Sequence, residues 1–192
     1  MSTVGIDAMI LVYAGIVPSK NDATSPQVIE LSLCSNRLLD QLSRDEATII
    51  LPTVAISELL VPVPLSESGL LIRALAEQFV CPAFDLPAAA IAANLWASHK
   101  KLPRDQQYSN RHVLKADTLI IASAKAAGAT IFYSNDRKCR ALAGIIMEAR
   151  GLPEKPSDLE EIFAESDRRS GAEPPPLKPK PKKNNAKKEK PD

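Results

Sequence analysis

The sequence contains few of the residues that build thiolate metal sites or disulfides. Its 192 residues include three cysteines and two histidines. Cys34, Cys81 and Cys139 lie far apart, without a CxxC motif or a Cys/His spacing. This distribution argues against both a structural zinc site and a disulfide framework. We therefore expect the three thiols to be reduced and buried.

A long hydrophobic segment is missing as well. The longest run of apolar or glycine residues near the start, residues 8–17, has ten residues, about half of what a helix needs to cross a bilayer. No basic region precedes this run, and Asp7 comes directly before it, so a signal peptide is not expected. These features predict a cytoplasmic protein with no membrane association.

The net charge of the whole chain is small, but the charges are unevenly distributed along it. The net charge is +1, yet residues 168–192 contain nine Lys or Arg and three acids, which leaves 15 basic and 20 acidic residues in the rest. The same segment is rich in proline and has almost no apolar residues, so it cannot bury enough surface to offset its ordering entropy. We predict one folded domain, residues 1–166, and a disordered Pro/Lys-rich tail, residues 167–192.

Short apolar runs alternate with helical patterns along the folded part. Strands separated by helices imply a mainly parallel sheet that is covered on both faces. Pro82 interrupts the third run, which favours an edge position for it. The predicted strands are Thr3–Ile6, Ala47–Leu51, Val80–Phe84, Ala129–Tyr133 and Ile145–Ala149. The predicted helices cover residues 9–13, 26–43, 53–60, 66–79, 87–101, 111–127 and 136–142, with a last one that Ser157 caps.

Two aspartates follow predicted strands at the edge where ligands collect. Asp7 comes directly after the first strand, and Asp136 follows the fourth strand closely. In parallel sheets, ligands bind beyond the carboxyl ends of the strands, where helix N-termini also point. The two carboxylates are therefore expected to meet in one crevice. Each aspartate is also a favoured N-cap for the helix that follows it, so a purely structural role stays open.

Two further acids interrupt apolar helical stretches. Glu58 is flanked by Ile56, Leu59 and Leu60, and Asp117 lies among Leu114, Leu119, Ile120 and Ile121. A buried carboxylate needs a compensating charge, and neither acid has a basic residue at an ideal helical spacing. A bound cation is the simplest partner for these acids, although a solvated helix face remains an alternative for Glu58.

The ordered set of four acids resembles the PIN domain family of metal-dependent ribonucleases. The resemblance is carried by VGIDAMILVYA, TVAISELL, KADTLIIASAKAAGA and IFYSNDRKCRAL, and it spans roughly residues 3–163. It is strongest to the VapC-type toxins of type II toxin–antitoxin modules. It implies a three-layer α/β/α sandwich with about five strands, and Mg²⁺ or Mn²⁺ held by Asp7, Glu58, Asp117 and Asp136. Ser134, just before Asp136, matches a small hydroxyl that the family often has there, and Asn135 is the neighbouring polar residue.

The chemistry that this resemblance implies is hydrolysis of RNA phosphodiester bonds by an endoribonuclease. All-oxygen ligands suit the hard ions Mg²⁺ and Mn²⁺. Such ions polarise a phosphodiester oxygen and activate a water for in-line attack, so no covalent intermediate is needed. A toxin would also bind a small antitoxin, through the helices within residues 54–63 or 70–79, and homodimers through similar surfaces are plausible.

Some residues outside the four acids are candidates for contact with RNA. Tyr108 lies in a polar segment with Arg104 and Arg111 nearby, a combination that favours stacking on an unpaired base. Trp96 sits in an apolar helix and is expected in the core. His99 and His112 are expected to be ordinary surface residues. The lysines of the tail either attract RNA or only keep the chain soluble.

Several other functions compete with this interpretation. A phosphatase of the haloacid dehalogenase type needs a second aspartate two residues after Asp7, where this chain has Met9. A dinucleotide-binding domain needs a GxGxxG motif after the first strand, and the chain has none. The remaining alternatives are a PIN-like RNA-binding or scaffold module without catalytic activity and a non-toxin PIN ribonuclease in RNA processing.

Overall fold

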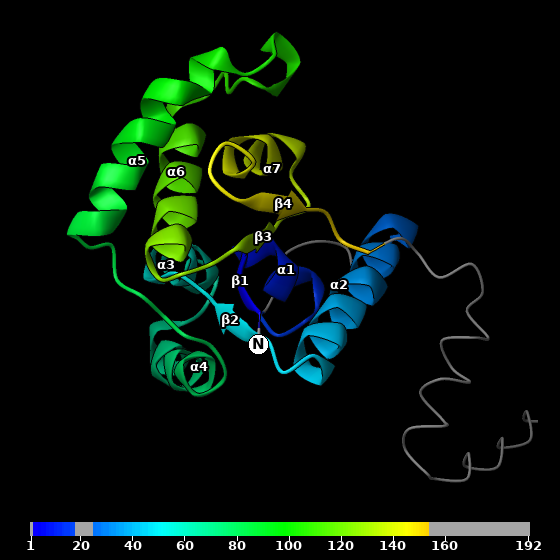
Figure 1. Ribbon diagram of the computed structural model, residues 1–192. Coiled ribbons are helices and arrows are strands. Elements are labelled where there is room, and N and C mark those ends of the chain that lie inside the picture. Colours follow the sequence, from blue (N-terminus) through cyan, green and yellow to red (C-terminus); the bar gives the residue numbers. More distant parts are fainter. Residues whose placement is uncertain (1, 18–24, 154–192) are drawn as a thin grey trace, which may run out of the picture. The chain divides into compact units, whose positions relative to one another are not determined.

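The computed structural model describes residues 2–17 and 25–153 (Figure 1). Within these ranges the chain forms four strands, seven α-helices and two short 3-10 helices. In chain order they are β1 (Thr3–Ile6), α1 (Ala8–Tyr13), α2 (Pro26–Arg44), β2 (Thr48–Ile50), α3 (Thr53–Leu60), α4 (Leu65–Gln78), α5 (Leu86–Ser98), η1 (His99–Lys101), η2 (Arg104–Gln106), α6 (Arg111–Ala126), β3 (Ile131–Tyr133), α7 (Arg137–Ala143) and β4 (Glu148–Arg150).

The strands form one parallel sheet in the order β2-β1-β3-β4. At the centre, Gly5 pairs in register with Ile50 on one side and Phe132 on the other. Helices α5 and α6 lie on one side of the sheet and α1 and α2 on the other (Figure 1). The predicted α/β architecture, with a parallel sheet covered on both faces, is therefore confirmed.

The sheet has fewer and shorter strands than the sequence predicts. Of the expected strand at residues 80–84, only Val80 remains, as an isolated parallel bridge to Ile50. Pro82 explains this loss because it has no N–H to donate and its ring restricts the residue before it. The last strand begins at Glu148 instead of Ile145, since residues 144–147 form a turn after α7.

The core lies between the sheet and its helices. Ile6, Phe132 and Leu51 are fully buried in it, together with Leu11 from α1 and Ile121 from α6. Parallel strands buried on both faces have few polar positions, which explains why the sequences of the two central strands, β1 and β3, are nearly continuous apolar runs.

Side chains cap several helix starts, and not always those that the sequence indicates. Asp85 accepts a hydrogen bond from the Ala88 amide (2.9 Å), and Asn110 accepts one from the His112 amide (2.8 Å). Ser25 precedes Pro26 as expected but makes no side-chain cap bond. The Thr53 hydroxyl donates to the Pro82 carbonyl (3.2 Å) instead of capping α3.

The three cysteines occupy different depths. Cys34 and Cys139 are buried, and Cys81 is half-buried. Among the described residues, no helix combines the length and the hydrophobicity that a bilayer crossing would need. The predicted Pro/Lys-rich tail, the helix after Ser157 and the domain boundary near residue 166 lie outside the described residues.

Candidate active site

Asp7 stands at the junction of β1 and α1. Its amide donates to the Tyr133 carbonyl (2.9 Å), which extends the pairing of β1 with β3 by one step. One carboxylate oxygen accepts from the Met9 amide (3.4 Å), and the other accepts from the Ser134 hydroxyl (2.7 Å). Asp7 is therefore both the N-cap of α1 and a carboxylate fixed at the carboxyl end of the sheet.

Asp136 has the equivalent place between β3 and α7. Its Oδ1 accepts from the amides of Lys138 (2.6 Å) and Cys139 (3.3 Å), so it is the N-cap of α7. Its own amide donates to the Ser134 hydroxyl oxygen (3.0 Å). The structural and functional interpretations of both aspartates are thus compatible, because capping uses one oxygen of each carboxylate.

Ser134 links the two strand-end aspartates. This fully buried hydroxyl donates to Asp7 and accepts from the backbone of Asp136. Its carbonyl in turn accepts from the Arg140 guanidinium (2.8 Å). Asn135, the other polar neighbour that the resemblance indicated, is exposed and is not among the residues that line the pocket formed by these acids.

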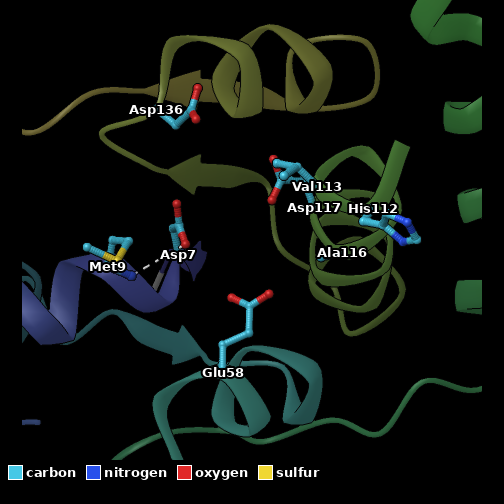
Figure 2. A pocket seen from close by; sticks show the side chains of 8 residues that line it. All are labelled: Asp7, Met9, Glu58, His112, Val113, Ala116, Asp117 and Asp136. Atoms are coloured by element: carbon cyan, nitrogen blue, oxygen red, sulfur yellow. Dashed lines mark hydrogen bonds between the residues drawn. The ribbon is translucent and has the colours of Figure 1, made fainter. Parts of the chain in front are cut away.

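Two helices supply the remaining acids. Glu58 comes from α3, and its carboxylate points toward Asp7 (Figure 2). Asp117 comes from the middle of α6, and its Oδ2 accepts a hydrogen bond from the Tyr108 hydroxyl (2.6 Å). Tyr108 is half-buried and packs against the core, so the loop before α6 holds this carboxylate in place.

The four acids line one pocket of about 360 Å³. Figure 2 shows their carboxylates arranged around a common space, while the His112 ring points away from them. No Lys or Arg is among the lining residues, so residues 2–17 and 25–153 supply no neutralising cation there. The residues that line the pocket are Asp7, Met9, Glu58, His112, Val113, Ala116, Asp117 and Asp136.

Burial and mutual repulsion raise the pKa values of three of these carboxyls. Burial is the largest cause for each. It raises the pKa of Asp117 to about 7, against the lowering effect of the hydrogen bond from Tyr108, and the charges of Asp7, Asp136 and Glu58 also raise it. The pKa of Asp7 is raised despite the opposing hydrogen bond from Ser134. The pKa of Glu58 is raised by partial desolvation and by the charge of Asp7.

The donor set of this pocket fits a hard divalent cation. Four carboxylates without a basic partner repel one another, and a cation removes that repulsion. Within residues 2–17 and 25–153, no three Asp, Glu, His or Cys side chains stand close enough, as placed, to hold one metal ion. Mg²⁺ usually keeps several waters and takes only one or two carboxylates directly. The pocket therefore suits an ion that some of the acids contact through water.

The residues predicted to contact RNA lie in different surroundings. Arg104 is exposed in η2. Arg111 begins α6, and its guanidinium carbon lies 5.9 Å from the centre of the Trp96 ring. The Tyr108 hydroxyl donates its hydrogen bond to Asp117. Burial and the charge of that carboxylate raise the pKa of the Tyr108 phenol. Trp96 is half-buried rather than enclosed in the core.

The contacts that support the site leave no pattern in the sequence. The bond between Tyr108 and Asp117 joins a loop to a helix and has no periodic signal in the sequence. The same holds for the ion pair between Arg137 and Asp105 (2.7 Å), which connects α7 to η2. Cys139 is buried close enough to the carboxylates that their charge adds to burial in raising its thiol pKa.

Comparisons with known proteins identify the fold. By sequence, the chain matches no protein-family model and no curated protein. By structure, it is similar to a chain of VapBC2 from Rickettsia felis, which was crystallised with a DNA fragment from the promoter. The TM-score is 0.52 with 14% sequence identity, covering 79% of this chain and 99% of that chain. The chain therefore has a PIN-like α/β fold, as the resemblance implied.

Proposed function

We propose that the protein is an endoribonuclease that depends on Mg²⁺ or Mn²⁺ and hydrolyses RNA phosphodiester bonds. The observation that carries this proposal is the convergence of Asp7, Glu58, Asp117 and Asp136 on one pocket to which the described part of the chain contributes no basic residue. The PIN-like fold supports it, since the acids sit beyond the carboxyl ends of parallel strands, where such sheets bind ligands.

The four carboxylates would hold the cation, and their neighbours would orient them. When bound, the cation supplies Lewis-acid activation of a phosphodiester oxygen and of the attacking water. Ser134 and the Met9 amide fix the two oxygens of Asp7. Tyr108 fixes one oxygen of Asp117. Pre-oriented ligands reduce the reorganisation that the reaction would otherwise require.

We also propose that the protein acts as the toxin of a toxin–antitoxin module. Its structural neighbour belongs to a complex named VapBC2. Large apolar side chains are exposed where α3 leads into α4. Val61 and Leu70 fall in the ranges 54–63 and 70–79 from which the sequence predicted an antitoxin groove, and Leu65 lies between these ranges. Val61, Leu65 and Leu70 are 84%, 92% and 71% exposed, respectively. Exposed apolar patches of this kind mark protein interaction sites.

The alternative is a PIN-like module that binds or scaffolds RNA without cutting it. Such a module would have no need for four carboxylates in one pocket, because their repulsion weakens the fold and hinders phosphate binding. The presence of all four acids favours catalysis over scaffolding. A ribonuclease of RNA processing would share the chemistry and differ only in lacking an antitoxin.

An assay with matched variants tests the ribonuclease proposal. In Mg²⁺, the wild type should cleave a mixture of tRNA, rRNA and messenger fragments, and Asp7→Asn should lower the rate at least about a hundredfold, because several kcal/mol of metal-assisted stabilisation are lost. Asparagine still caps a helix, so α1 should persist. Glu77→Gln, an exposed change in α4, is the control and should leave the rate unchanged.

Thermal unfolding gives a readout that does not depend on cleavage. A ligand at a hundred times its Kd stabilises the folded state by about 2.7 kcal/mol. Mg²⁺ should therefore raise the Tm of the wild type and of Glu77→Gln, and raise that of Asp7→Asn much less. Equal Tm shifts in all three proteins, or full cleavage in EDTA, would contradict the proposal. A Tm shift without cleavage would support the scaffold alternative.

A further inference from the structure

A second pocket lies between α5 and α6. It has a volume of about 500 Å³, larger than that of the carboxylate pocket. The two helices run side by side (Figure 1), and each contributes part of the lining. The lining residues are Ala92, Ala93 and Trp96 from α5, and Arg111, His112, Lys115, Thr118 and Leu119 from α6.

This pocket has the opposite electrostatic character to the carboxylate pocket. Arg111 and Lys115 are cationic, and no Asp or Glu is among the lining residues. Its apolar lining includes the half-buried Trp96 ring, over which the Arg111 guanidinium lies at 5.9 Å. An aromatic surface beside two cations is the combination that binds a nucleobase and its phosphates.

The two pockets adjoin at the first turn of α6. His112 lines both of them. Along the helix, residues 113, 116 and 117 line the carboxylate pocket, while residues 111, 115, 118 and 119 line the second pocket. The two pockets thus lie on different faces of α6 and meet at His112, so a polymer of alternating bases and phosphates would pass this residue to occupy both.

We infer that the pocket between α5 and α6 holds one unpaired nucleotide of the RNA, adjacent to the phosphodiester bond in the carboxylate pocket. The base lies against Trp96 and Arg111, and a phosphate contacts Lys115. This inference rests on the proposed ribonuclease function and adds a substrate preference to it. In a duplex the faces of a base are covered by its neighbours, so the pocket selects single-stranded RNA.

An acidic protein segment is the competing occupant, since it would also be attracted by Arg111 and Lys115. The aromatic ring and the continuity with a site built for phosphodiester chemistry favour a nucleotide. An acidic peptide has no flat ring system to stack on Trp96. The four carboxylates of the neighbouring pocket would also repel its negative charges.

Fluorescence provides a direct test because Trp96 is the single tryptophan of the chain. The Asp7→Asn variant is used because its cleavage of bound RNA should be strongly slowed. In Mg²⁺ it is titrated with a six-nucleotide single-stranded RNA, with a hairpin duplex and with a hexaglutamate peptide. The single strand should quench or shift the tryptophan emission. The duplex and the peptide should do so only at concentrations at least about tenfold higher.

Variants of the lining residues identify the pocket. With a labelled single-stranded RNA, Trp96→Ala should weaken binding about tenfold. Lys115→Ala should weaken it several-fold and lower the slope of log K against log salt by about one. Lys125→Ala, in the last turn of the same helix and outside the pocket, is the matched control. Lys115 is exposed, so its variant tests the pocket even where Trp96→Ala fails to fold.

The outcomes separate this inference from the proposed function. Binding by Lys115→Ala equal to that of Lys125→Ala, equal quenching by the duplex, or quenching by the peptide alone would overturn the inference. Cleavage by the wild type combined with any of these results would leave the ribonuclease proposal intact. Quenching by single-stranded RNA without any cleavage would sustain the nucleotide pocket and reject the ribonuclease.

Discussion

At the level of single residues, Ser134 explains how two distant parts of the chain form one site. Its hydroxyl is fully buried and joins Asp7 to the backbone of Asp136, although the two aspartates are separated by 128 intervening residues. The sequence indicated Ser134 only through a family resemblance. Nothing in the local pattern shows that the hydroxyl is buried, because burial depends on the pairing of β1 with β3.

The raised pKa of Asp117 predicts that the stability of the metal-free protein depends on pH. Below pH 4 this carboxyl is protonated in both the folded and the unfolded state. Between pH 4 and about 7 the unfolded state loses the proton while the folded state keeps it, so the free energy of unfolding falls as pH rises. Each unit of pKa difference corresponds to about 1.4 kcal/mol.

Urea unfolding in EDTA at pH 4.5, 5.5, 6.5 and 7.5 measures this effect. In the Asp117→Asn variant, the free energy of unfolding should fall less steeply as pH rises. A residual slope should remain because the pKa values of Asp7 and Glu58 are also raised. Glu77→Gln should retain the wild-type decline. A slope that Asp117→Asn leaves unchanged would show that this carboxyl titrates normally in the folded protein.

At the level of elements, the sequence predicts helices better than strands. The helix of residues 111–127 and the helix of residues 26–43 appear within one residue of their expected ends, as α6 and α2. Both have long apolar faces with polar flanks, which periodicity detects. The strand at residues 80–84 was wrong beyond Val80, since a short run is defined by its pairing partner and Pro82 has no N–H for the next bond, although its carbonyl still accepts from the Thr53 amide.

The central strand has no room for a side chain at Gly5. A Cβ there would lie 2.8 Å from the Ala124 Cβ of α6 and 2.8 Å from a ring carbon of Phe132. Gly5→Ala should therefore push α6 away from β1 and destabilise the protein by about 1–3 kcal/mol. Since α6 carries Asp117, the same variant should also lower the affinity for Mg²⁺.

Gly69→Ala is the matched control for that prediction. Gly69 lies within α4, and a Cβ there would meet no atom within 4 Å. Alanine is favoured over glycine in a helix by up to about 1 kcal/mol, so this variant should be neutral or stabilising. Denaturant unfolding of both variants gives the comparison. The same sign of change in both would show that the close packing of β1 against α6 is not what excludes a side chain at Gly5.

At the level of the whole molecule, the exposed apolar residues near α4 predict a partner. If the protein is a toxin and these residues bind its antitoxin, Leu65→Glu and Leu70→Glu together should abolish binding of that antitoxin, and growth arrest on expression of the chain should persist. Ile29→Glu, at an exposed apolar position of α2, should leave antitoxin binding intact. Co-purification and growth rescue measure the two effects.

If the double variant binds the antitoxin as well as the wild type does, the antitoxin interface lies elsewhere on the protein. A double variant that loses growth arrest as well would indicate a defect in folding. A second possibility is that the same residues form a homodimer. Sedimentation of each protein without the antitoxin tests it, since such a homodimer would dissociate in the double variant but not in the wild type or Ile29→Glu.

Much of the site can be predicted from the sequence, because acidic residues stand out from their apolar surroundings and the parallel topology brings strand ends together. Asp7 and Asp136 follow strands, and the carboxyl ends of parallel strands share one edge, so their proximity could be predicted. Glu58 and Asp117 stood out as acids in apolar helices. The pocket between α5 and α6 could not be predicted, because it depends on how far two helices are separated and on which side of α5 the Trp96 ring lies.

The double role of the two strand-end aspartates affects how homologous sequences should be interpreted. Each caps a helix, and replacing such a cap by alanine costs about 1 kcal/mol. If the proposed ribonuclease activity is correct, a descendant that lost it would thus still be selected to retain both aspartates. Among relatives, degeneration of the active centre should become visible first at Glu58 and Asp117, whose carboxylates start no helix.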